Sequence, residues 1–240
     1  MPTLLITGSN RGLGLGVAGK IAAAGWHVHA CCRDPATATE LRGISEAAAG
    51  RLTIHALDIR DFDAVRALAG TLKGKAIDIL LNNAGIMEPR QSSFDREDLS
   101  QNFGHVNYED WMTVLRVNLL GTAYMAECFV EHVAQSERKI IANMSSSLGS
   151  IEKNVFGGWY AYRTSKTAIN MLTRNLAHDL APRGITAVAL HPGWVRTDMG
   201  GPKAEISPEE STSGLTEVLL NLTPSQSGRF IAWDGSEVPW

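Results

Sequence analysis

A tyrosine and a lysine four residues apart are well suited to acid–base chemistry. Tyr162 and Lys166 bound the segment YRTSK at 162–166, and on a helix this spacing places the phenol and the ammonium on one face. A free phenol has a pKa of about 10, and a nearby ammonium favours the phenolate and so lowers that pKa. The pair therefore predicts a general acid or base. An amphipathic surface helix is the alternative interpretation of the same spacing.

Further polar side chains follow apolar segments that read as strands. The serines at 145–147 close the segment 139–144, where a hydroxyl can hold a substrate oxygen. The segment NNAG at 82–85 follows the apolar run at 77–81. Asn118 lies in the middle of a long helical stretch, where asparagine is a poor helix former. It either belongs to a site or is a buried side chain that is satisfied locally.

A glycine-rich turn follows the first apolar segment, with the sequence TGSNRGLG at 7–14. A strand, such a turn and a helix N-terminus together present backbone amides to an anion, and a pyrophosphate fits. Gly8 permits the turn, Gly12 a close approach to phosphate, and Gly14 packing of the helix on the sheet. A tight connection without a ligand is the alternative. The GxGxxG string at 14–19 lies inside the helix and is not assigned to the site.

The end of the second apolar segment favours NADP(H) over NAD(H). It reads Cys31-Cys32-Arg33-Asp34, and an arginine there accommodates a 2'-phosphate, whereas an acid grips the ribose hydroxyl. Arg33 suits the phosphate, Arg11 can add a second cation, and neutral Cys32 occupies the place of the acid. Asp34 can alternatively serve the hydroxyl or form a surface ion pair with Arg33.

The elements that position these residues alternate along the chain. Strands are expected at about 3–7, 27–32, 52–57, 77–81, 139–144, 185–190 and 229–232, and helices near 12–24, 36–48, 61–72, 109–134, 160–181 and 208–221. Ser207, Pro208 and Glu210 form a capping box for the last helix. Alternation of this kind predicts one α/β domain over residues 1–240, a doubly wound Rossmann-type fold with a parallel sheet and ligands at the carboxyl ends of its strands. The long loops at 86–107 and 193–206 are candidate substrate loops.

Composition excludes several other classes. The chain has 240 residues, 44% of them hydrophobic and 20% charged, with a net charge of −3; these values exclude disorder, collagen and coiled coil, and argue against nucleic acid as a partner. Neither the three cysteines nor the seven histidines show ligand spacing, so no disulfide framework and no metal site is expected. Without a signal segment or an apolar run of about 18 residues, we expect a soluble, cytoplasmic protein with no membrane partner.

In combination, seven motifs resemble those of the short-chain dehydrogenase/reductase family. They are TGSNRGLG at 7–14, Asp58, NNAG at 82–85, Asn118, the serine run, YRTSK at 162–166 and HPGWVRT at 191–197, and the resemblance spans residues 3 to about 232. Within the family, the chain is most similar to the NADPH-dependent carbonyl reductases of the sniffer or C-factor-like type. The resemblance implies a mostly or wholly parallel seven-stranded sheet.

The resemblance also implies a catalytic tetrad of Asn118, Ser146, Tyr162 and Lys166. Tyr162 would protonate the carbonyl oxygen, Lys166 would lower the tyrosine pKa and bind the nicotinamide ribose, Ser146 would hold the substrate oxygen, and Asn118 would complete a water-linked relay. Ser146 is preferred to its two neighbours because it lies three residues before Gly149. The spacing from Ser146 to Tyr162 exceeds the common one, so residues 150–160 are expected to form a substrate-facing loop.

The cofactor-binding residues follow from the same resemblance, group by group. Lys166 and Tyr162 would contact the nicotinamide end, and the 2'-phosphate would lie at Arg33. The turn would bind the pyrophosphate and adenosine end through Thr7, Gly8, Asn10, Arg11, Gly12, Leu13 and Gly14. The adenine would lie at Asp58 and Ile59, the adenosine side at Asn82, Ala84 and Gly85, and the nicotinamide carboxamide at Pro192, Gly193, Val195 and Thr197.

Apolar and aromatic residues near these motifs favour a hydrophobic aldehyde or ketone over a sugar, although core or lid packing explains them equally well. They are Phe156, Trp159, Trp194, Met199 and the segment after Gly85. Carbonyl reduction is the leading hypothesis; a nucleotide-sensing or signalling protein and an NAD-linked alcohol dehydrogenase are the alternatives. The helices at 109–134 and 160–181 resemble those through which family members dimerise, so a homodimer or homotetramer is compatible with the sequence.

Overall fold

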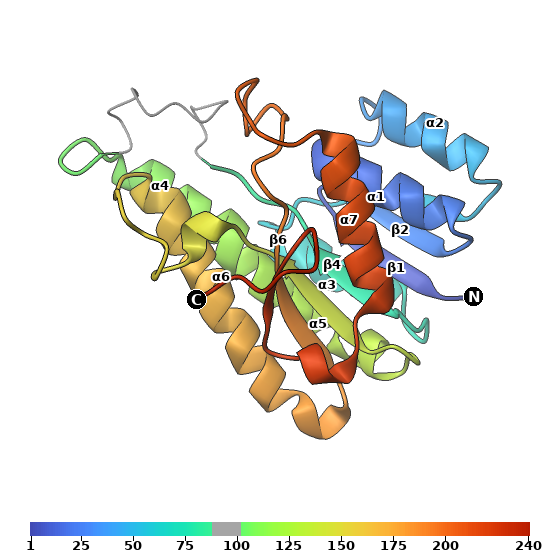
Figure 1. Cartoon of the computed structure of the whole chain (residues 1–240). Helices are drawn as coiled ribbons and strands as arrows, with labels where there is room; N and C mark the ends of the chain where they lie inside the picture. The colour runs from blue at the N-terminus through green and yellow to red at the C-terminus, as the bar shows by residue number, and fades with distance from the viewer. Residues whose placement is uncertain (88–101) are drawn as a thin grey trace.

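Seven parallel strands form the centre of the molecule in a computed structural model of the chain, which describes residues 1–87 and 102–240 (Figure 1). Within these residues the strand order is β3-β2-β1-β4-β5-β6-β7, and each neighbouring pair is parallel. The expected fold class is confirmed. The strands are β1 (Thr3–Thr7), β2 (His27–Cys32), β3 (Leu52–Ala56), β4 (Ile79–Asn82), β5 (Ile140–Met144), β6 (Thr186–His191) and β7 (Phe230–Ala232).

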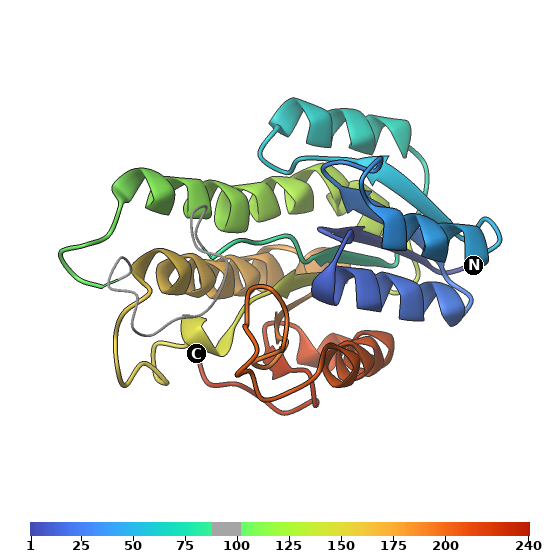
Figure 2. The same cartoon turned by 90° about the horizontal axis from the view of Figure 1, so that it is seen from above.

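Helices cover both faces of this sheet, as Figure 2 shows. Apolar side chains of α1, α2 and α7 pack on one face, and those of α3, α5 and α6 on the other. The strands between them, apart from the edge strand β3, are almost fully buried, which explains their continuous apolar runs. The helices are α1 (Gly12–Ala23), α2 (Thr39–Ala47), α3 (Phe62–Thr71), α4 (Tyr108–Leu115), α5 (Thr122–Ala134), α6 (Tyr160–Asp179) and α7 (Pro208–Asn221).

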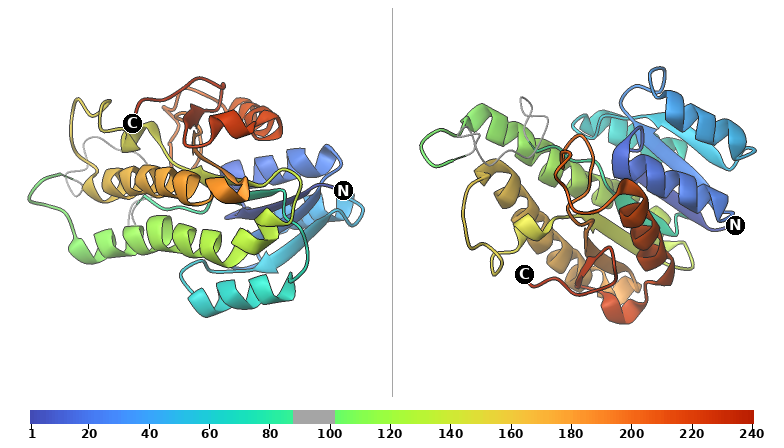
Figure 3. Two further views of the ribbon diagram at one scale, coloured as in Figure 1. Left: turned by 90° about the horizontal axis from the view of Figure 1, so that it is seen from below. Right: turned by 45° about the horizontal axis from the view of Figure 1, so that its top comes forward.

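The start of α7 has the expected capping box. Ser207 Oγ accepts from the Glu210 amide at 3.1 Å, and the Ser207 amide donates to Glu210 Oε2 at 2.8 Å. Both bonds satisfy amides that the helix itself leaves free. The helix α7 lies beside α1 (Figure 3), and an ion pair of 2.6 Å joins Glu209 to Lys20 of α1.

The long helix expected at 109–134 is interrupted by a π-helical turn. The turn η2 (Arg116–Gly121) separates α4 from α5, and Asn118 lies within it. A Cβ at Gly121 would come within 3.0 Å of Ile59 O, so this helix packs closely against the loop after β3. Turns of this type are often found at functional sites. The position of Asn118 within this turn explains why an asparagine is found in the middle of the helical stretch.

The strand order reverses between β1 and β4, since the chain moves outward from β1 on both sides. Ligands of doubly wound sheets bind at such a point, beyond the carboxyl ends of the strands. Of the loop expected at 86–107, residues 88–101 lie outside the described residues. Among those described, no helix is long and apolar enough to span a membrane.

Candidate active site

The phenol of Tyr162 and the hydroxyl of Ser146 meet at the carboxyl edge of the sheet. Tyr162 lies in the first turn of α6, Ser146 follows β5, and both are buried. The Ser146 hydroxyl lies near enough to the phenol to lower its pKa slightly. The neighbouring Ser145 instead donates to Asn170 Oδ1 at 2.6 Å, which commits its hydroxyl to the packing of α6. The geometry therefore favours Ser146 over Ser145 as the serine beside the phenol.

Lys166 lies one turn further along α6, with its side chain almost fully buried. Its Nζ donates to Met144 O at 2.8 Å and lies 5.5 Å from the centroid of the Tyr162 ring. Burial raises the pKa of Tyr162 to about 12, against a smaller lowering by Ser146, and burial lowers the pKa of Lys166 to about 8. The sequence predicts a lowered tyrosine pKa. The direction is opposite here because desolvation disfavours the charged form of both groups.

Asn118 has both ends of its amide hydrogen-bonded. Its Nδ2 donates to Ile86 O at 2.8 Å and to Ser165 Oγ at 2.9 Å, and its Oδ1 accepts from the Ile86 amide at 2.8 Å. The side chain is thus satisfied locally, yet it lies beside Lys166. A Cβ at Gly85 would be 3.3 Å from both Asn118 Oδ1 and Lys166 Nζ. Gly85 keeps this space open, and the proposed water relay remains a prediction.

The glycine-rich turn has the backbone geometry that a pyrophosphate requires. Gly8 and Gly12 have φ of +66° and +55°, which residues with a Cβ rarely adopt. A Cβ at Gly14 would lie 2.2 Å from Gly8 O, so only glycine fits there. The helix α1 follows with Arg11 as its N-cap and no acidic residue in its first turn. Because arginine has no acceptor atom, it leaves these amides to an anion, and the turn fits a dinucleotide.

Asn83 supports the turn from the neighbouring strand, a role that the sequence interpretation missed. Its Nδ2 donates to Thr7 O at 2.9 Å and to Gly8 O at 3.0 Å, so it fixes the carbonyls that shape the turn. The motif NNAG was the available signal, but Asn82 and Asn83 could not be told apart without knowing which side chain faces β1.

Two expected cofactor ligands instead have buried, structural side chains. Thr7 Oγ1 accepts from the amides of Asn83 and Ala84 at 3.1 and 3.0 Å. Asn82 Nδ2 donates to Asn143 Oδ1 at 2.9 Å, in the interior of the sheet. The side chains of Thr7 and Asn82 therefore join β1, β4 and β5, and cofactor binding at these two positions stays a prediction.

The residues expected at the nucleotide end lie at the ends of β2 and β3. Arg33 is exposed. The Asp34 carboxylate accepts hydrogen bonds from the Ala36 amide and the Thr37 hydroxyl, both at 3.0 Å, and so shapes a turn. The alternative expectation was an ion pair between Asp34 and Arg33. This ion pair is not among the contacts of the described residues. Arg11, in turn, pairs with Asp198 at 2.7 Å.

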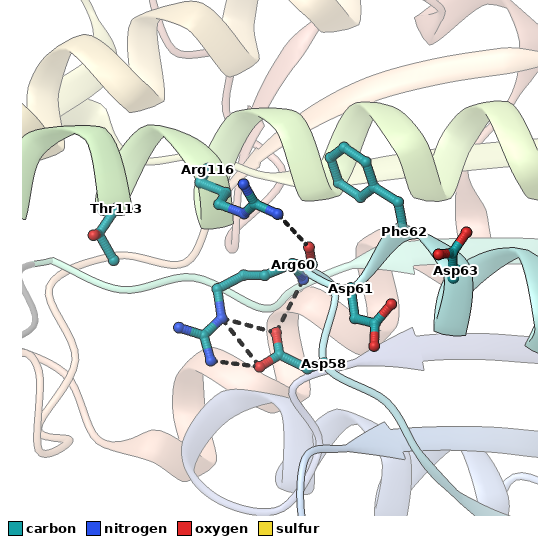
Figure 4. A pocket seen from close by; sticks show the side chains of 7 residues that line it. All are labelled: Asp58, Arg60, Asp61, Phe62, Asp63, Thr113 and Arg116. Carbon is teal, nitrogen blue, oxygen red and sulfur yellow. Dashed lines mark hydrogen bonds and ion pairs between the residues drawn. The ribbon is translucent and has the colours of Figure 1, made fainter.

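Asp58, expected at the adenine, is held by a neighbouring arginine. Arg60 Nε lies 3.0 Å from both carboxylate oxygens of Asp58, and Arg60 Nη2 lies 2.5 Å from Oδ2 (Figure 4). The hydrogen bonds from Arg60 hold the pKa of Asp58 below its usual value, and the charge of Arg33 adds to this effect. Arg116 Nη2 donates to Arg60 O at 3.1 Å. A pocket of about 540 Å³ opens beside these residues.

Residues 192–197, which we call the strap, lie against the turn. The side chain of Thr197 comes within 3.9 Å of the position that a Cβ on Gly12 would take. Val195 pairs with Ile206, and Gly193 has φ of +84° with no room for a Cβ beside Ile206. The strap thus has a fixed shape and lies next to the turn that would hold the pyrophosphate.

Apolar side chains surround the phenol and form what we call the substrate wall. Its members are Met87, Leu148, Trp159 and Met199, which pack with Tyr162. Trp159 is buried and adopts φ of +47° at the N-cap of α6. Phe156 meets the Trp159 ring edge-on, with centroids 5.8 Å apart, whereas Trp194 Nε1 donates to Gly200 O within its own loop. Of the expected lining groups, Trp159, Met199 and, from the segment after Gly85, Met87 therefore reach the tyrosine.

In the described ranges, no group of three histidine, cysteine or acidic side chains is arranged to hold a metal ion.

Known proteins resemble the chain in both sequence and structure. A family model described as short chain dehydrogenase matches residues 2–207. The protein C-signal of Myxococcus xanthus is 38% identical over 176 residues, which cover 73% of this chain and 100% of that protein. Carbonyl reductase Sniffer of D. melanogaster is 35% identical, with a TM-score of 0.88 and 100% of both chains covered. NADPH-bound carbonyl reductase from chicken fatty liver is 32% identical, with a TM-score of 0.88 and 100% and 99% covered. The chain belongs to the short-chain dehydrogenase family of oxidoreductases.

Proposed function

We propose that this protein reduces a hydrophobic aldehyde or ketone with NADPH. The observation that carries the proposal is a buried phenol that packs with the substrate wall and lies near Ser146, in a chain whose glycine-rich turn leaves the amides of α1 to an anion. Tyr162 keeps its proton at neutral pH, because burial raises its pKa to about 12, and a protonated phenol is the form that an acid needs. The similarity to carbonyl reductases supports the same activity.

The four polar side chains divide the work. Ser146 donates to the carbonyl oxygen and orients it, and Tyr162 transfers its proton to that oxygen as negative charge develops there. Lys166, with a pKa of about 8, stabilises the charge left on the phenol and can exchange a proton near neutral pH. Asn118 holds the main chain at Ile86 and keeps the space beside Lys166. NADPH, when bound, supplies the hydride.

Arg33 supports a preference for the phosphorylated cofactor. It is an exposed cation at the end of β2, and Asp34 is committed to its own turn, so no acid at this position is free to grip a ribose hydroxyl. Arg33→Asp should weaken NADPH binding by about a hundredfold, as expected for loss of a charge-assisted contact and gain of a repulsive one. Affinities measured for NADPH and NADH test the preference; equal affinities in the unaltered protein would refute it.

The activity is tested by NADPH consumption across a panel of aldehydes, quinones and ketones, with Tyr162→Phe as the decisive variant. We expect turnover to fall by at least about a thousandfold, because the proton donor is gone, while NADPH affinity stays within about twofold. Ser146→Ala should reduce turnover by about a hundredfold, and Ser147→Ala serves as the matched control. Substantial turnover by Tyr162→Phe would contradict the proposed mechanism.

A signalling protein that binds the nucleotide as a switch is the second candidate. The similarity to C-signal favours it. It shares the turn and the strap with the first candidate but does not require proton transfer by Tyr162. NADPH binding without oxidation by any carbonyl in the panel would support it against the reductase.

The proposal extends to assembly and location. Met112 on α4 and Met171 on α6 expose most of their surface, which supports a homodimer or homotetramer formed through these helices. Light scattering of the purified protein measures the mass of the assembly, and a monomer at micromolar concentration would contradict it. A small-molecule carbonyl as the partner and a cytoplasmic location complete the proposal.

A further inference from the structure

One histidine connects the two loops that flank the catalytic residues. His191 ends β6, and its Nδ1 accepts a hydrogen bond from the Ser147 amide at 3.2 Å and from the Gly193 amide at 3.4 Å. Ser147 directly follows Ser146, and Gly193 lies in the strap. A single lone pair is therefore shared between the loop of the catalytic serine and the segment expected at the nicotinamide.

The backbone on both sides of the histidine is fixed. His191 O accepts from the Trp233 amide at 2.8 Å, and β6 pairs with β5 up to the register Met144–Leu190. Ser146 Oγ accepts from the Leu148 amide at 3.2 Å. The neighbouring amide, that of Ser147, has His191 Nδ1 as its hydrogen-bond acceptor. The imidazole thus completes the set of contacts that hold the peptide next to Ser146.

We propose that His191 is a positioning residue, which aligns Ser146 with the strap by accepting both amides. The proposal rests on the proposed function for its catalytic consequence. An acceptor at Nδ1 requires that the ring be neutral with its proton on Nε2. Burial lowers the pKa of His191 to about 4, and the charge of Lys153 lowers it further while that of Asp234 raises it. The ring is therefore an acceptor throughout the neutral range.

Two variants separate this role from simple packing. In His191→Asn the Oδ1 atom takes the position of Nδ1, so the acceptor is kept on a smaller side chain. In His191→Gln the acceptor moves one bond further away, although the side chain is larger. We expect kcat of the asparagine variant to stay within about threefold of the unaltered enzyme, and kcat of the glutamine variant to fall by about tenfold or more, as a misplaced reacting group does. Packing alone predicts the opposite order.

Amide hydrogen exchange provides a test that does not depend on turnover. The Ser147 amide should exchange slowly in the unaltered protein and in His191→Asn, and much faster in His191→Gln. If no carbonyl is turned over, the proposed function fails, and the exchange rates alone decide the role of His191. Fast exchange at Ser147 in the unaltered protein, or equal losses of protection in the two variants, would overturn the proposal.

Discussion

The cofactor side and the substrate side of the candidate active site are built in different ways. On the cofactor side, the turn at 7–14 is shaped by backbone: Gly14 sits where a Cβ would be 2.2 Å from Gly8 O. On the substrate side, the wall is made of large apolar side chains, Trp159 and Met199 among them. A glycine that lies against backbone cannot be replaced by a larger residue, whereas apolar side chains of similar volume can replace one another. We therefore expect the glycines of the cofactor side to tolerate no substitution, and the side chains of the substrate wall to determine substrate preference.

The starts of α1 and α7, two helices that lie side by side, show the same contrast. The start of α7 is closed by its own residues, Ser207 and Glu210, with Glu209 adding a second carboxylate to the first turn. The start of α1 has Arg11 at its N-cap and no carboxylate in its first turn. One helix satisfies its first amides internally, and the other leaves them and its positive dipole end for a ligand.

Among these substitutions, Gly14→Ala on the cofactor side should have the largest effect on stability and on NADPH affinity. The added methyl would overlap Gly8 O and approach Asn83 Nδ2 at 2.6 Å, so the turn must move. We expect the free energy of unfolding to fall by about 3 kcal/mol, as in other overpacked sites, and the NADPH dissociation constant to rise at least about a hundredfold. Urea unfolding and fluorescence titration measure the two quantities.

Gly43→Ala is the matched control for this prediction. Gly43 lies within α2, where an added Cβ meets nothing within 4 Å, so alanine should raise stability by about 0.5–1 kcal/mol through its helix propensity. NADPH affinity should not change. Equal effects of the two substitutions would remove the distinction between the turn and an ordinary helical glycine.

Acid should destabilise the folded protein through buried histidines, and His29 beneath the cofactor side is one of them. His29 on β2 is buried, with its Nδ1 2.9 Å from Nε2 of His55, and burial lowers its pKa to about 3 from 6.5. Below pH 6.5, His29 therefore binds a proton in the unfolded chain but stays neutral in the folded protein. The free energy of unfolding is then highest above this pH and decreases as the pH falls. Linkage gives a loss of about 2 kcal/mol between pH 7.5 and 5.

Unfolding measured against pH checks this prediction, with His29→Gln as the control. The variant lacks the group, so its stability should change less over the same interval. A pH dependence that is the same in both proteins would contradict the assignment to His29.

Sequence patterns predicted the elements and the motifs because those depend on local rules. Continuous apolar runs specified the strands, and Ser207 with Glu210 specified the start of α7. The tetrad residues Ser146, Tyr162 and Lys166 came together as expected. Features that depend on tertiary packing were not predictable: the π-helical turn around Asn118 arises from contacts with Ile86 and Ser165, which are remote in sequence.

The pKa of Tyr162 shows the same limit more clearly. The spacing to Lys166 predicts proximity, and proximity alone predicts a lowered pKa. Burial reverses the direction, and its extent depends on the substrate wall, including Trp159 in a left-handed conformation that favours glycine. Neither this conformation nor the role of Asn83 follows from residue types, since both depend on which side chain faces a neighbouring element.

Removing the indole of Trp159 should change substrate preference without changing cofactor binding. In Trp159→Ala we expect kcat/KM for a bulky aromatic ketone to fall by about tenfold, the size of one aromatic contact with its buried area. A short aliphatic aldehyde should be affected much less, and NADPH affinity should stay the same. Steady-state kinetics with the two substrates measure the change.

Trp159→Gly separates the side chain from the backbone at this position. Glycine also removes the indole but adopts φ of +47° without the cost of about 1 kcal/mol that alanine carries there. The glycine variant should therefore match the alanine variant in substrate preference and exceed it in stability. An equal loss for both substrates in both variants would show that Trp159 acts on the catalytic helix rather than on the substrate.

The ion pair between Arg11 and Asp198 joins the two sides, and breaking it should have the smallest effect. Both side chains are largely exposed, so the pair itself contributes little to stability. Asp198→Asn frees Arg11 beside the turn, where it can interact with phosphate, and we expect NADPH affinity to rise by about two- to threefold at low salt. The gain should vanish near 1 M salt, where charges are screened beyond about 3 Å.

Glu237→Gln breaks a comparable exposed pair with Arg229, at the far edge of the sheet, and should leave NADPH affinity unchanged. A loss of affinity in Asp198→Asn would instead mean that the pair holds the strap in its binding position, and the two sides would then be coupled rather than independent.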